Sequence, residues 1–152
     1  MSKRHTELMA AIGMAGGIVQ TYRSQTIHVS KGIEKRLNQI DQCVSMAVHT
    51  FGRVGQKNVM AIAEKIDKAN NDKYILGRAR SIVTFIDYAT WLLESTLMGD
   101  MPAGMIKGIR GKVIIMRLIE SMMELRYEVA GNNSYTMSSI AGIKAAERWM
   151  QL

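Results

Sequence analysis

The sequence predicts an all-α protein, an antiparallel bundle of four or five helices with long coiled-coil-like seams, and three observations support this. The 152 residues contain a single proline, Pro102, so no other position carries the residue that most strongly interrupts helices. Apolar residues recur at alternating steps of three and four over long stretches, which is the spacing of one helical face. Hydrophobic residues make up 47% of the chain and charged residues 22%, the balance of a folded globular protein. We therefore expect one helical domain over residues 1–152.

The first helix is expected to begin at Thr6, acting as its N-cap, and to carry the apolar segment 8–19. The three glycines of this segment each cost up to ~1 kcal/mol relative to alanine, unless a neighbouring backbone packs closely against them. The basic residues before the segment loosely imitate a signal peptide, but Glu7 lies at the border and no cleavage site of small residues follows. The segment is also too short to cross a bilayer, which takes about 20 residues.

A strong helical seam begins after an extended connector at residues 26–29 (TIHV), and Ser30 stands at its start. Its apolar positions alternate in steps of four and three, as in a coiled coil. They are Ile33, Leu37, Ile40, Val44, Ala47 and Phe51. After Gly52 and Gly55 the stripe continues through Val59, Ile62 and Ile66 as far as Asn70. One long helix with a weak middle and two separate helices both fit this pattern.

Three further helices are expected in the second half of the chain. The first covers residues 72–98, where the inward positions are Ile75, Ala79, Ile82, Ile86, Ala89, Leu93 and Leu97, and Gly99 is a good C-terminal stop. The next begins near Ala103, with Ile109, Val113, Met116, Ile119, Met123 and Tyr127 expected to face inward. A last helix is expected over residues 136–150. Long seams of this kind also suit a homo-oligomer, because an amphipathic helix needs a partner for its apolar stripe.

The one cysteine, Cys43, cannot form an intrachain disulfide, so nothing indicates an oxidising compartment. We interpret it as a buried structural thiol and expect a cytoplasmic location.

No arrangement of residues predicts catalysis, a metal site or a cofactor. The three histidines are scattered, and no GxSxG element is present. Glu120, Glu124 and Glu128 share a helical face, but carboxylate metal sites in bundles also need a Glu-x-x-His pair, so we expect a solvated, salt-bridged face. Asp87 and Glu94 are of interest only if the fold buries them. The sequence therefore predicts a protein that is not an enzyme.

Basic charge supplies the leading functional hypothesis. The net charge is +7, and two short motifs, residues 52–57 (GRVGQK) and 108–112 (GIRGK), combine paired glycines with basic residues ahead of an apolar helix. Glycines let backbone amides approach a phosphate, and a helix start adds free amides and a positive dipole end. The second motif is not a P-loop, because Val113 follows its lysine. We predict nucleic-acid binding through backbone phosphates by Lys31, Lys35, Arg36, Arg53, Lys57, Arg110 and Lys112.

The alternative is a protein-interaction module, such as an assembly factor or an inhibitor of a larger complex, with an acidic or apolar partner surface. Its contacts would be the helix seams and two methionine clusters, since methionine adapts to irregular surfaces although it also fills cores. The clusters are Met98, Met101 and Met105, and Met116, Met122 and Met123. Attachment to a membrane surface by the segment 8–19 is a third, less favoured interpretation.

Overall fold

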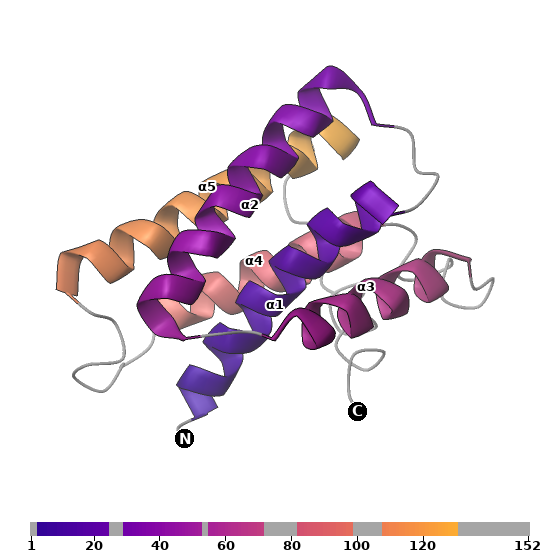
Figure 1. The fold of residues 1–152 in the computed structure, drawn as a ribbon. Coiled ribbons are helices and arrows are strands. Elements are labelled where there is room, and N and C mark those ends of the chain that lie inside the picture. Colours follow the sequence, from indigo (N-terminus) through magenta and orange to yellow (C-terminus); the bar gives the residue numbers. More distant parts are fainter. Residues whose placement is uncertain (1–2, 25–28, 53–54, 72–81, 99–107, 131–152) are drawn as a thin grey trace.

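A computed structural model of the chain contains five helices in the part that it describes, which comprises residues 3–24, 29–52, 55–71, 82–98 and 108–130 (Figure 1). The helices are α1 (Lys3–Ser24), α2 (Lys31–Phe51), α3 (Gln56–Asn71), α4 (Ile82–Met98) and α5 (Gly108–Ala130). No strand occurs among these residues. The predicted all-α fold is therefore confirmed.

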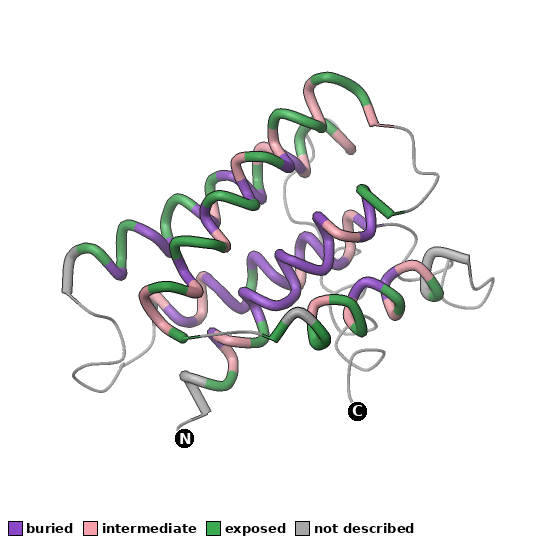
Figure 2. Tube along the Cα trace, viewed as in Figure 1, coloured by how far each residue is buried: buried purple, intermediate pink, exposed green. Residues whose placement is uncertain are grey.

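Helix α1 is the central element of the bundle. It packs against α2, α3 and α4, and residues 11–19 are buried without a break, as the continuous purple of α1 in Figure 2 shows. A helix that is apolar on every side is expected in the interior of a protein. The predicted start at Thr6 is wrong, because α1 begins at Lys3 and Thr6 lies within its first turns. The segment 8–19, for which membrane attachment is the less favoured interpretation, has most of its apolar residues inside the bundle, with Ala10 exposed and Met9 partly buried.

Close packing on α3 explains Gly17 of α1. A Cβ atom added to Gly17 would overlap Cγ2 of Ile62 and lie 3.1 Å from its Cβ, whereas one added to Gly16 would lie 3.4 Å from Val59. The hydroxyl of Thr21 donates to the carbonyl of Gly17 at 2.7 Å and lies 3.4 Å from that of Ala63. The missing side chain at Gly17 therefore lets the two helices approach, and this contact offsets its low helix propensity.

Helix α2 follows the predicted seam closely. The side chain of Ser30 caps the helix by accepting a hydrogen bond from the Ile33 amide at 3.2 Å. The seam positions Leu37, Ile40 and Ala47 are buried, and Ile33, Val44 and Phe51 pack against the core. Cys43 is buried, as predicted.

The chain breaks between α2 and α3, which decides between the one long helix and the two helices that the sequence allowed. Gly52 ends α2 with a φ of 122°, a backbone conformation that other residues rarely adopt, and its amide donates to the carbonyl of Val48. The sequence therefore forms two helices.

Helix directions follow from pairs of contacting residues. Arg36 meets Glu124 and Cys43 meets Ser121, so α2 and α5 run antiparallel. Gly16 of α1 lies against Val59 of α3 and Thr21 lies near Ala63, so α1 and α3 run parallel (Figure 1).

Several predicted features lie outside the described residues. They are the connector residues 26–28, the first part of the helix predicted from residue 72, the segment around Pro102 and Ala103, and the last helix at residues 136–150. None of the helices in the described part combines the length and the apolar composition needed to cross a membrane.

Candidate interaction surface

Helix α5 carries two apolar stripes. The stripe that is buried in the structure is not the one predicted to face inward. The core receives Ile114, Ile115, Leu118, Met122 and Leu125, all nearly inaccessible to solvent. The predicted inward residues instead face outward, with exposed fractions of 37% for Val113, 58% for Met116, 52% for Met123 and 59% for Tyr127. The predicted inward face of this helix is therefore wrong for these positions. Ile119 lies at the boundary and is partly buried.

Glu120 explains why the core takes the other stripe. It lies on the same helical face as Met116 and Met123, and burying a carboxylate without a partner is costly. The buried stripe has Ser121 at the matching level, a small side chain whose hydroxyl donates to the Arg117 carbonyl at 2.9 Å. This arrangement leaves Glu120 exposed and gives the buried hydroxyl of Ser121 a hydrogen-bond partner.

The exposed side of α5 borders an open groove of about 520 Å³. Helix α4 contributes Leu97, and α5 contributes the rest of the lining, namely Met116, Ile119, Glu120, Met123, Glu124 and Tyr127. We call Val113, Met116, Glu120, Met123 and Tyr127 the outward stripe. Single exposed apolar residues are ordinary on a protein surface, but a row of four on one helical face beside a groove marks a candidate contact site.

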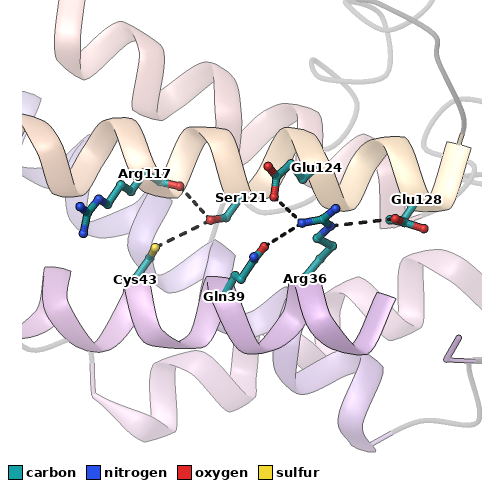
Figure 3. A network of polar contacts seen from close by, with 7 residues as sticks. All are labelled: Arg36, Gln39, Cys43, Arg117, Ser121, Glu124 and Glu128. Carbon is teal, nitrogen blue, oxygen red and sulfur yellow. Dashed lines mark hydrogen bonds and ion pairs between the residues drawn. The ribbon is translucent and has the colours of Figure 1, made fainter. Parts of the chain in front are cut away.

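A polar network along the flank of α5 joins this helix to α2 (Figure 3). The Arg36 guanidinium donates to Glu124 at 2.8 Å and to Gln39 at 3.3 Å, and lies 4.0 Å from Glu128. The salt-bridged face predicted for the glutamates is thus found at Glu124 and Glu128. No cluster of potential metal ligands occurs among the described residues.

The residues predicted to contact phosphate do not form one patch. Lys31 and Lys35 are exposed at the start of α2, and Arg110 and Lys112 are exposed at the start of α5. Because these helices run antiparallel, the two pairs lie at opposite ends of a helix pair about 30 Å long.

The other predicted phosphate ligands are also dispersed. Lys57 is exposed in the first turn of α3, and Arg36 is engaged with two glutamates. Arg53 lies outside the described residues. Arg117, which sequence reasoning missed, is exposed one further turn along α5 from Lys112. Its spacing of seven from Arg110 could have indicated that it shares the same face.

A buried ion pair fixes α5 to α4. Asp87 accepts from Nε of Arg126 at 2.5 Å and from its Nη2 at 3.3 Å, and the aspartate side chain is only 3% exposed. Burial raises the pKa of Asp87, while the hydrogen bond and the charge of Arg126 act in the opposite direction. Asp87 is thus one of the two acidic residues of α4 whose burial would make them of interest, but its partner Arg126 was not predicted from the sequence.

Comparison of the chain with protein-family models, with curated proteins and with solved structures finds no match. The function therefore has to be inferred from these surfaces alone.

Proposed function

We propose that the protein is an interaction module that receives an apolar helix of a partner protein on the outward stripe of α5. The observation that carries the proposal is the exposure of Met116, Met123 and Tyr127, each more than half accessible, beside an apolar groove. Helix-in-groove recognition uses apolar anchors at helical spacing, which the stripe offers.

The spacing and the residue types of the stripe both suit this role. Its positions alternate in steps of three and four, the spacing of a coiled-coil seam. Methionine adapts to partner shape, and tyrosine is enriched among residues that dominate binding energy. The proposal keeps the non-enzymatic class, the assembly-factor or inhibitor role and the cytoplasmic location expected from the sequence, and it makes the coiled-coil-like seam an intermolecular one.

Photo-crosslinking in the source cells tests this proposal. We would replace Met123 by p-benzoylphenylalanine, with the same replacement at Met60 as the matched control, because Met60 is an exposed methionine on α3 outside the groove. The proposal predicts discrete protein adducts from position 123 that are missing from position 60. Equal adduct patterns from both positions, or no protein adduct from position 123, would contradict it.

Nucleic-acid binding is the second candidate function, and one observation favours a smaller site than the sequence predicted. Arg110, Lys112 and Arg117 are exposed on the first half of α5, and no described side chain forms an ion pair with them. The start of a helix adds a favourable dipole for phosphate.

Fluorescence anisotropy with labelled duplex DNA and single-stranded RNA tests this second function. For duplex DNA, replacing the three basic residues by glutamine should reduce the log–log salt slope by roughly 0.9 for each phosphate that the variant no longer neutralises. The control is the double variant Lys31→Gln/Lys35→Gln at the other end of the α2–α5 pair. Weak binding with equal slopes for all three proteins would argue against a site on α5.

A further inference from the structure

The charges of α5 are sorted by sign along its length. The first half carries only basic charges, Arg110, Lys112 and Arg117. The second half carries three glutamates, Glu120, Glu124 and Glu128, and one arginine, Arg126, which is held by Asp87 in the interior. Arg36 of α2 contacts Glu124 and Glu128, so Glu120 is the exposed glutamate of this half without an ion pair to a described side chain. The charge therefore changes from positive to negative between Arg117 and Glu120, near the middle of the outward stripe.

Helix chemistry does not explain this order. Basic residues are unfavourable near a helix start and acidic residues near a helix end, because both oppose the helix dipole. Helix α2 accounts for the acidic end, where Arg36 contacts Glu124 and Glu128. It does not account for the basic half, because residues 42–51 of α2, which run beside it, contain no carboxylate.

We propose that the partner on the outward stripe is a second copy of this chain, with the two α5 helices packed antiparallel about a two-fold axis. A two-fold contact brings the same patch of both subunits together, so the patch must be complementary to itself. The antiparallel arrangement places the basic half of each α5 against the acidic half of the other. A parallel arrangement would instead oppose like charges. This inference rests on the proposed function and identifies its partner.

The contact is small, so the dimer forms reversibly. The stripe from Val113 to Tyr127 is about 21 Å long at 1.5 Å per residue. One helix pair of this length buries an area toward or below the ~1,200 Å² at which stable interfaces begin, so we expect a weak dimer with a dissociation constant on the order of micromolar.

A charge swap at the centre of the stripe tests both the dimer and its orientation. Arg117 and Glu120 are exposed, and neither forms an ion pair with a described side chain, so changing them should leave the fold intact. Sedimentation velocity of the full chain from about 2 to 200 µM would measure the dissociation constant. We expect Arg117→Glu and Glu120→Arg each to raise it by roughly tenfold, because each places like charges at the two symmetric contacts. Circular dichroism of each variant would check that the fold is unchanged.

The double variant Arg117→Glu/Glu120→Arg restores opposite charges and should return the dissociation constant to within about threefold of the original. Failure of this rescue would overturn the antiparallel dimer, and so would a monomer throughout the concentration range. A monomer that still gives adducts from position 123 to another protein would leave the proposed function standing. A monomer whose adducts form within one chain would show that another segment of the same chain covers the stripe, and would overturn both proposals.

Discussion

Helices α1 and α5 differ in what becomes of their apolar residues. Neither helix has a single apolar face. In α1 the apolar residues surround the helix, and the bundle buries the whole run 11–19 because α2, α3 and α4 pack around it. In α5 they form two stripes, and the bundle buries only one. Burial therefore distinguishes the two helices: α1 lies at the centre of its own fold, whereas α5 leaves one apolar stripe exposed, for which we propose an intermolecular contact.

The largest loss of stability is expected from a substitution in the ion pair that attaches α5 to α4. Asp87→Asn removes the carboxylate from the buried pair with Arg126, and we expect it to lower the free energy of unfolding by about 3–5 kcal/mol. The double variant Asp87→Leu/Arg126→Met should be much closer to the original protein, because it removes both charges together. Urea unfolding followed by circular dichroism measures both. A double variant as unstable as the single one would show that the ion pair itself is needed.

The two stripes of α5 can be compared directly by alanine substitution. Leu118 is 1% exposed, so Leu118→Ala should cost about 2–5 kcal/mol of unfolding free energy. Met116 is two residues away on the outward stripe, and Met116→Ala should change the unfolding free energy by no more than about 0.5 kcal/mol. Chemical denaturation below the concentration at which dimers form gives both values. Similar losses for the two variants would mean that both stripes are buried in solution.

The burial of α1 is expected to appear as a loss of stability in alkali. Burial raises the pKa of Tyr22 to about 12, so the folded state favours the neutral phenol. This contribution is fully present below the unfolded pKa of about 10 and disappears as the pH rises from there through the folded value, with a total of about 3 kcal/mol. The unfolding free energy should therefore fall more steeply between pH 10 and 12 in the original protein than in Tyr22→Phe. Parallel pH profiles would contradict the burial of this side chain.

Substitutions at the contact between α1 and α3 are expected to change the unfolding free energy less, and the neighbouring glycines of α1 provide a matched pair of variants. Gly17→Ala gains helix propensity but forces a methyl group onto Ile62, so we expect a net loss of about 1–3 kcal/mol. Gly16→Ala meets Val59 at ordinary contact distance and should be neutral or stabilising by up to about 1 kcal/mol. Thermal and urea unfolding would compare the pair. An equal response of the two variants would exclude the close approach at Gly17.

The contrast between α2 and α5 also shows what the sequence can predict. The apolar positions of α2 form one seam and its charged residues occupy the rest of the surface, so periodicity identified the buried residues correctly. In α5 two stripes compete, and a choice by periodicity selected the wrong one. The position of Glu120 within the outward stripe was the available signal.

The arrangement of charged residues at the candidate site also depends on how the helices pack, which the sequence alone did not predict. Sequence grouped Lys31 with Arg110 by their charge, but the antiparallel packing of α2 and α5 separates them. The sequence also could not reveal that Arg36 contacts Glu124, because the two residues are 88 positions apart in the chain.

The double variant Met116→Gln/Met123→Gln tests the central claim most directly, because stability and self-association can be measured on the same sample. If the outward stripe is an intermolecular surface, the variant keeps its unfolding free energy within about 0.5–1 kcal/mol and loses the sedimenting dimer. A loss of more than about 2 kcal/mol would place the two methionines in a core, and an undiminished dimer in a stable variant would place the contact elsewhere.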